Sequence, residues 1–105
     1  MFLPNYLNYG TKTIGAGGVA VGYGTRANSI GAHAEGYYSI AAGKYSHAEG
    51  KMTKAGYAAH SEGRETEALG ENAHSEGVWT RALGNYSHAE GKDTDALGGC
   101  SHTEG

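Results

Sequence analysis

The chain has 105 residues, including 19 glycines and a single cysteine, and its 8 basic and 11 acidic residues give a formal net charge of -3. So many glycines and so few large aliphatic residues exclude a thick apolar core, and the scattered charges exclude the basic stripe of a nucleic-acid-binding protein. One cysteine excludes an intrachain disulfide framework, and no stretch is long and apolar enough to span a membrane.

The N-terminal residues differ from everything that follows. Residues 1–10 fit the later repeat poorly and lack the basic and apolar regions of a secretory signal, so we predict an N-terminal cap or linker there. From Thr11 onward the chain follows one short repeat, which predicts a single repeat domain over residues 11–105 that stops within a repeat. We therefore expect either assembly inside the producing cell or a sequence cut from a longer chain.

A tetrapeptide close to His-Ala-Glu-Gly recurs six times and contains every histidine of the chain. It begins at His33, His47, His60, His74, His88 and His102, so successive copies are 14, 13, 14, 14 and 14 residues apart. One period earlier, Val19 and Val21 occupy the positions that His33 and Glu35 take in the next unit. Fold and function should consequently be considered per repeat.

The positions of each unit are counted from its histidine as position 1. Each unit contains two short runs that alternate with a period of two, separated by glycines at positions 4 and 11. We expect these glycines to form turns with positive φ. They are Gly22, Gly36, Gly43, Gly50, Gly56, Gly63, Gly70, Gly77, Gly84, Gly91 and Gly98. Two strands and two turns per 14 residues predict an all-β fold, a parallel β-roll or β-solenoid whose coils stack about 4.8 Å apart.

The unit resembles a known family. Gly18-Val19-Ala20-Val21-Gly22, followed by Thr25 and Ala27, is similar to the YadA-like head repeat of trimeric autotransporter adhesins, and the His-Ala-Glu-Gly form is similar to repeats of phage tail-fibre and appendage proteins. The resemblance covers about nine-tenths of the chain and implies a left-handed parallel β-roll in a homotrimer. Six coils depart from it by carrying His and Glu in place of Val and Ile, so the binding sequences of adhesin heads do not transfer.

The resemblance implies that positions 1 and 3 point inward, because the family packs Val and Ile there. We therefore predict a structural ladder in which His and Glu meet the Thr of position 7, since a buried carboxylate needs partners. Its members are His33, Glu35, His47, Glu49, His60, Glu62, His74, Glu76, His88, Glu90, His102, Glu104, Thr53, Thr66, Thr80 and Thr94. Whether they face the roll interior or a trimer axis stays open.

The same residues suggest a metal site or a catalytic pair. Threefold symmetry would form rings of three histidines, a plausible zinc or nickel geometry. Every coil repeats the pair, however, as a structural network does, so we expect no metal and no cofactor. No nucleophile and no distinct pocket accompany the pair, and we expect no catalysis.

Aromatic residues gather among the variable outward positions. Tyr37, Tyr38, Tyr45 and Trp79 could contact a glycan or receptor by stacking, but such residues are also typical of subunit-interface rims, which we favour. Leu69, Leu83 and Leu97 form a stripe that we expect to seal neighbouring chains or a corner of the roll.

These features predict a non-catalytic segment of a trimeric fibre, either a phage tail fibre or appendage or a bacterial surface adhesin head. It would serve as a rigid shaft or host-attachment module on a virion tail or cell surface, with a host receptor or glycan as a further partner. A bacterial adhesin head that binds host matrix or glycan is the first alternative, and an ice-binding or metal-binding β-solenoid is the second. Neither nucleic acid nor membrane is expected to bind this segment.

Overall fold

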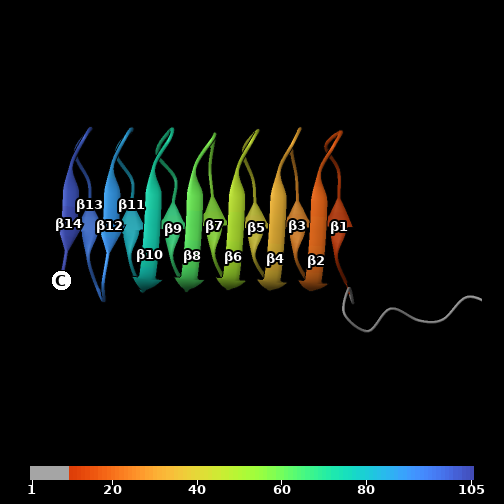
Figure 1. Cartoon of the computed structure of the whole chain (residues 1–105), viewed down its shortest axis with the longest axis horizontal. Helices are drawn as coiled ribbons and strands as arrows, with labels where there is room; N and C mark the ends of the chain where they lie inside the picture. The colour runs from red at the N-terminus through yellow and green to blue at the C-terminus, as the bar shows by residue number, and fades with distance from the viewer. Residues whose placement is uncertain (1–9) are drawn as a thin grey trace, which may run out of the picture.

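The computed structural model describes residues 10–105, which form a flattened parallel β-solenoid of two facing sheets. The chain alternates between the sheets, so each coil contributes one strand to each (Figure 1). Of the predicted N-terminal cap or linker at residues 1–10, residues 1–9 lie outside the described residues. Within residues 10–105 no helix is long and apolar enough to cross a membrane.

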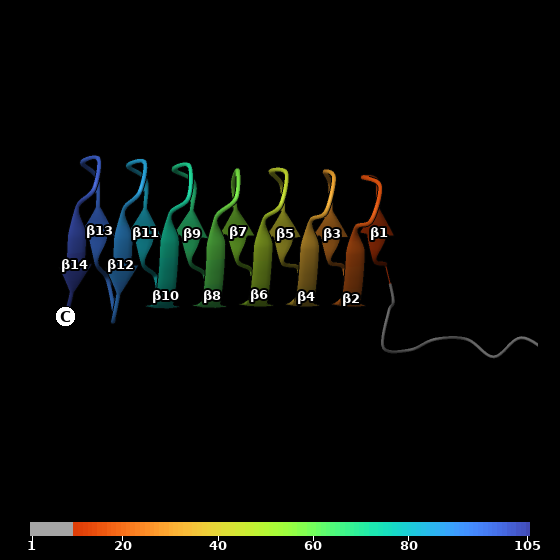
Figure 2. The ribbon, with the colours of Figure 1, turned by 45° about the horizontal axis from the view of Figure 1, so that its top comes forward.

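The sheets differ in strand length. The short-strand sheet, in spatial order, consists of β1 (Lys12–Thr13), β3 (Arg26–Ala27), β5 (Ile40–Ala41), β7 (Lys54–Ala55), β9 (Glu67–Ala68), β11 (Arg81–Ala82) and β13 (Asp95–Ala96). The long-strand sheet consists of β2 (Val19–Tyr23), β4 (His33–Tyr37), β6 (His47–Lys51), β8 (His60–Arg64), β10 (His74–Val78), β12 (His88–Glu90) and β14 (His102–Glu104). The tilted view separates the two layers (Figure 2).

Identical positions of successive repeats are paired in register. His33 is the partner of His47, which is the partner of His60, and the same alignment continues to His102. The 13-residue coil keeps this register in both sheets, because Lys54 still pairs with Glu67 and the missing residue falls in the turn after β7. The predicted all-β parallel solenoid with one coil per 14 residues is therefore confirmed.

The interior between the sheets holds only small side chains. Alanines of β3, β5, β7, β9, β11 and β13 are completely buried, and they face the alanine or serine at position 2 of the long strands. Threonine is the largest side chain that is fully buried among the described residues. A two-residue strand can hold its place because its backbone bonds to the coil on each side, not because it carries a large apolar residue.

The two glycine columns exist for different reasons, which corrects part of the turn prediction. At position 4, exemplified by Gly63 with φ +108°, the backbone is left-handed and a Cβ would overlap the carbonyl oxygen of the next coil's glycine. Position 11 lacks positive φ. Its members Gly43, Gly56, Gly70 and Gly84 approach the next coil too closely for a Cβ, and Gly98 has open space around it.

Positive φ also occurs at the two corners of each coil, on glycines in the first coils and on non-glycine residues from Tyr38 onward. Ten such non-glycine residues have φ between 49° and 61°, among them Tyr38, Tyr45 and Trp79. The side chains at these corners are on the surface. Their positive φ costs free energy, because a residue with a Cβ rarely adopts this backbone conformation. In-register pairing on both sides of each corner holds that conformation in place.

Candidate functional site

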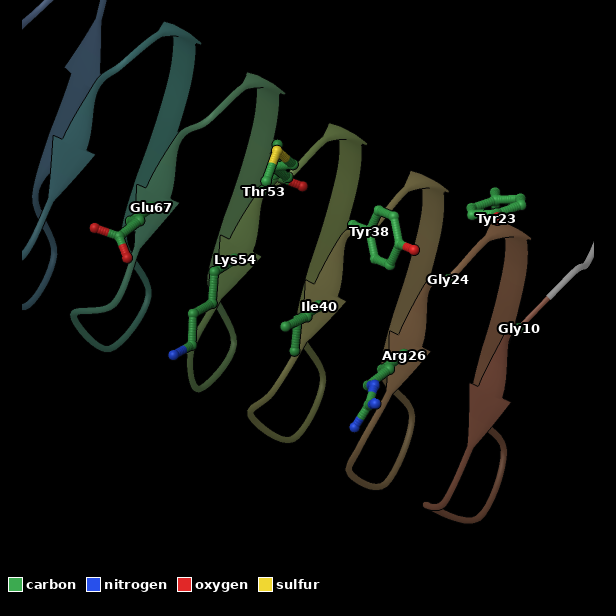
Figure 3. A pocket seen from close by; sticks show the side chains of 10 residues that line it. Gly10, Tyr23, Gly24, Arg26, Tyr38, Ile40, Thr53, Lys54 and Glu67 are labelled. Carbon is green, nitrogen blue, oxygen red and sulfur yellow. The ribbon is translucent and has the colours of Figure 1, made fainter.

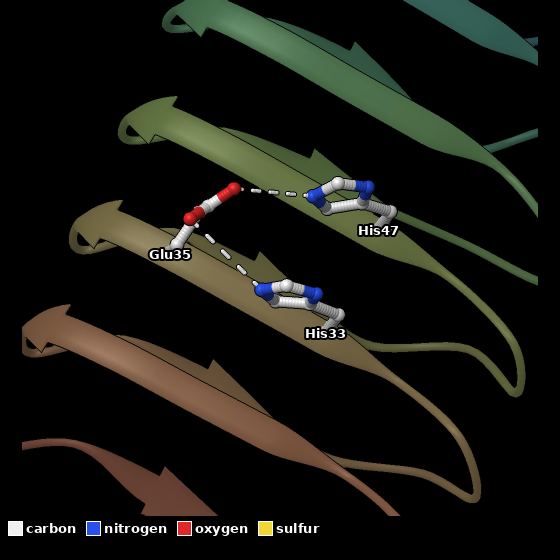
Figure 4. Close-up of side chains that lie close together, drawn as sticks. All are labelled: His33, Glu35 and His47. Carbon is white, nitrogen blue, oxygen red and sulfur yellow. Dashed lines mark hydrogen bonds and ion pairs between the residues drawn. The ribbon is translucent and has the colours of Figure 1, made fainter.

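The histidines and glutamates form a continuous ladder along the outer face of the long-strand sheet. Nε2 of each histidine from His47 to His102 hydrogen-bonds to Oε1 of the glutamate one coil earlier, at 3.1–3.4 Å. The other carboxylate oxygen faces the histidine of its own coil, as at 4.0 Å between His33 and Glu35 (Figure 4). Each described carboxylate from Glu35 to Glu62 thereby links two successive coils.

The imidazole rings stack on one another. Their centroids are 4.6–4.9 Å apart, and successive planes differ by 2–16°. This spacing matches the separation of parallel strands, so the sheet itself places the rings face to face. The ladder is therefore a direct product of in-register pairing.

The expectation that His and Glu point into the roll is wrong. Side-chain exposure is 36% for His47 and 31% for Glu49, whereas Ala48 between them is completely buried. The alternation was correct but its phase was reversed, because an interior filled by alanine, serine and threonine has no room for an imidazole. The signal was present at position 2, where Ala34, Ala48, Ser61, Ser75 and Ala89 are all small.

The threonines predicted to complete the ladder lie on its opposite side. Thr53, Thr66 and Thr80 are buried between the sheets, and the mixed His–Glu–Thr rung does not form. Thr66 donates its hydroxyl proton to the carbonyl of Glu62 at 3.1 Å, so Ser61 is the donor in the 2.7 Å bond between the two hydroxyls. The same arrangement joins Thr80, Ser75 and the carbonyl of Glu76.

The other two predicted threonines, Thr53 and Thr94, belong to coils that have alanine at position 2. Thr53 donates instead along the stack to Ser39 at 3.0 Å, and Ser39 donates to the carbonyl of Gly50. Thr94 donates to the carbonyl of Glu90 at 3.0 Å. Sequence reasoning missed the role of Ser61 and Ser75, whose matching hydroxyls at position 2 were the available signal.

The predicted aromatic contacts do not form one cluster. Tyr37 and Tyr38 contact Tyr23 at one end of the long-strand sheet, with Tyr23 and Tyr37 stacked at 5.3 Å and Tyr38 edge-on to both. Tyr45 lies at the opposite corner, edge-on to Tyr57 at 6.1 Å. Trp79 lies three coils beyond Tyr38 and contacts Arg64, Lys92 and Glu65.

Five groups of ligating atoms recur along the ladder, each formed by one glutamate and two histidines with all atoms within 4.8 Å of one another. Zn–N bonds of about 2.0–2.1 Å separate two ligand nitrogens by at most about 4.2 Å. Parallel rings 4.7 Å apart would therefore have to rotate out of their stack to share an ion. The arrangement observed is suited to hydrogen bonding within the ladder.

No family model matches the chain, and no curated protein or solved structure matches it. The site must consequently be interpreted from its own geometry.

Lowering the pH should destabilise the fold below about pH 4.5. A hydrogen bond with the Glu49 carboxyl lowers the pKa of Glu35 from 4.5, burial opposes this shift, and His47 and His33 lower the pKa further. A hydrogen bond from Arg81 likewise lowers the pKa of Asp95 from 3.8. A carboxyl whose pKa is lowered by folding contributes stability above its unfolded pKa, and that contribution disappears as the pH falls through the folded value.

Thermal melting between pH 6 and pH 3 tests this expectation. Glu35→Gln should melt at a temperature that depends less on pH than the wild-type melting temperature does. Glu71→Gln is the control, because the Glu71 carboxylate makes no hydrogen bond or ion pair within residues 10–105. An equal pH dependence for wild type and Glu35→Gln would contradict a stabilising role of the ionised ladder.

Proposed function

We propose that this chain is a structural, non-catalytic segment of a homotrimeric fibre, a left-handed YadA-like β-roll of the phage tail-fibre or adhesin-head kind. The observation that carries the proposal is the interior between in-register coils, where no fully buried side chain within residues 10–105 is larger than threonine. Such an interior leaves no space for a substrate, and rigid stacking produces an extended shape. A shaft or host-attachment module uses that shape directly.

The ladder face is the surface that we assign to the trimer interface. Val19 and Val21, on the same face as the ladder, are 45% and 41% exposed in the single chain. These residues align with the Val and Ile that YadA-like head repeats, which this unit resembles, pack inward. Because they point away from the coil interior here, another copy of the chain packed on this face would bury them.

A trimer also offers the half-exposed ladder a second set of partners. Five glutamates of the ladder, from Glu35 to Glu90, already accept a hydrogen bond from one imidazole, and their carboxylates retain further acceptor capacity. Burying the ladder among three chains would strengthen its hydrogen bonds, because water would no longer compete for them. On this proposal the segment acts outside the cell, on a virion tail or a bacterial surface.

The mass of the native protein in solution tests the proposal. Light scattering should give three times the 10.9 kDa of one chain. Val21→Lys, which places a charge on the proposed interface, should lower the measured mass. Ile40→Lys is the control on the outer face of the short-strand sheet, where Lys12 and Lys54 occupy equivalent positions, and it should leave the mass unchanged. A monomeric wild-type protein would exclude the trimeric fibre.

A further inference from the structure

A groove of about 570 Å³ lies across the N-terminal coils on the side of the short-strand sheet. Arg26, Ile40, Lys54 and Glu67 come from four successive strands and line its length, and Tyr23 and Tyr38 lie at one side (Figure 3). Its volume is within the range of pockets that bind small molecules. The groove is open because Gly10 and Gly24 occupy the corner position that Tyr38 and Met52 fill in later coils.

The groove carries two exposed cations. Arg26 and Lys54 are exposed, and neither forms an ion pair or a side-chain hydrogen bond within residues 10–105. Lys12, aligned with Arg26 in the preceding coil, extends the row. Farther along the same sheet, in contrast, Arg81 is bound to Asp95 by two hydrogen bonds of 2.7 and 3.0 Å. Arg26 and Lys54 thus leave two positive charges without an ion pair at the groove, whose described lining includes one carboxylate, that of Glu67.

The spacing of these cations is set by the fold. Arg26 and Lys54 are separated by one intervening strand, which places their backbones about 10 Å apart on parallel-strand geometry. That separation is about the length of a disaccharide. Ile40 lies between them and presents an apolar side chain at the place where a sugar ring would lie.

Tyr38 supplies a stacking surface next to the cations. Its ring packs over Gly24, where a Cβ would come within 2.6 Å of Tyr38 Cε1, and 47% of the residue stays exposed. Contacts with Tyr23 and Tyr37 hold the ring in place. A fixed aromatic ring beside guanidinium and ammonium groups suits a ligand with sugar faces and carboxylates.

We propose that this groove binds an acidic glycan carrying about one carboxylate per disaccharide, with Arg26 and Lys54 pairing successive carboxylates and Tyr38 stacking on a sugar ring. The inference deepens the host-attachment role proposed above and rests on it. Glu67 closes the far end of the groove by repelling a further carboxylate.

Binding of a hyaluronan hexasaccharide to the full chain tests the proposal by calorimetry. The methyl ester of the same hexasaccharide keeps the sugar rings without the charge, and polyphosphate keeps the charge without the rings. The acidic hexasaccharide should bind at least about tenfold more tightly than either. Absence of hexasaccharide binding overturns the proposal, and so does equal or tighter binding of polyphosphate.

Variants separate the groove from general electrostatic attraction. Arg26→Gln combined with Lys54→Gln should weaken hexasaccharide binding at least about tenfold. Tyr38→Gly, which introduces the residue of the preceding coil, should weaken it about fivefold to tenfold. Lys44→Gln combined with Lys92→Gln removes two exposed positive charges elsewhere and should change binding less than twofold. Equal weakening by both double variants overturns the proposal.

The solution mass of each variant distinguishes this proposal from the fibre proposal. Groove variants should keep the wild-type mass and melting temperature, because the altered side chains are exposed or half-buried. If they instead lower the mass, the groove is a contact between copies of the chain and the glycan site is excluded. A monomer that still binds the hexasaccharide would reject the fibre but retain the groove.

Discussion

Replacing Gly70 by alanine should destabilise the fold severely, while the same replacement at Gly98 should not. Both residues occupy position 11 of their coils, and neither has positive φ. A Cβ at Gly70 would overlap the backbone carbonyl of Gly84, whereas at Gly98 the nearest atom is Ser101 Cβ at 4.0 Å. The added methyl group is the same, so the difference between the two variants measures the close approach of neighbouring coils.

We expect Gly70→Ala to lower the free energy of unfolding by at least about 3 kcal/mol, because the overlapping atoms belong to backbone that pairs on both sides and cannot move alone. Gly98→Ala should change it by less than about 0.5 kcal/mol. Urea unfolding followed by circular dichroism gives both values. Similar losses of unfolding free energy at the two positions would show that position 11 requires glycine for its backbone conformation, and not because a Cβ would overlap the next coil.

Replacing Ala68 by leucine should have an effect of similar size, because the space between the sheets is closed. Ala68 is completely buried, and the surrounding columns consist of alanine, serine and threonine. A leucine side chain would force the sheets apart and disturb the hydroxyl bond between Ser61 and Thr66, only 2.7 Å long. We expect a loss of about 3 kcal/mol in the free energy of unfolding.

Glu67→Leu is the matched control for that change. Glu67 precedes Ala68 in β9 and points to the outer face, where Ile40 shows that the same column accepts a branched apolar residue. The variant should stay within about 0.5 kcal/mol of wild type in urea unfolding. Comparable destabilisation by both substitutions would mean that the solenoid interior is not tightly filled.

The repeat itself was sufficient to predict the fold. A 14-residue period with two alternating runs allows only coils that stack in register, and the one 13-residue unit keeps that register because its deletion falls in a turn. Glycine at position 4 was also correctly predicted to have positive φ. Glycine adopts such a backbone conformation readily because it has no Cβ. These predictions depend on backbone pairing alone, which repeats with the sequence.

The candidate site was predicted only in part. His–Glu pairing was expected and is observed between successive coils, but its location on the outer face was not. An alternation with a period of two shows which residues share a face, but it leaves open which of the two faces is inside. The choice was settled by volume, because alanine and serine at position 2 fit between the sheets and imidazole does not.

The sequence alone determined the number of coils, their register and the recurrence of His and Glu on one strand face, because each follows from the repeat period. Only the tertiary structure decided which face is buried, why position 11 requires glycine, and that Arg26, Lys54 and Tyr38 border one groove. Those properties depend on distances between coils and on the narrow gap between the sheets. Such distances arise only when the chain stacks on itself.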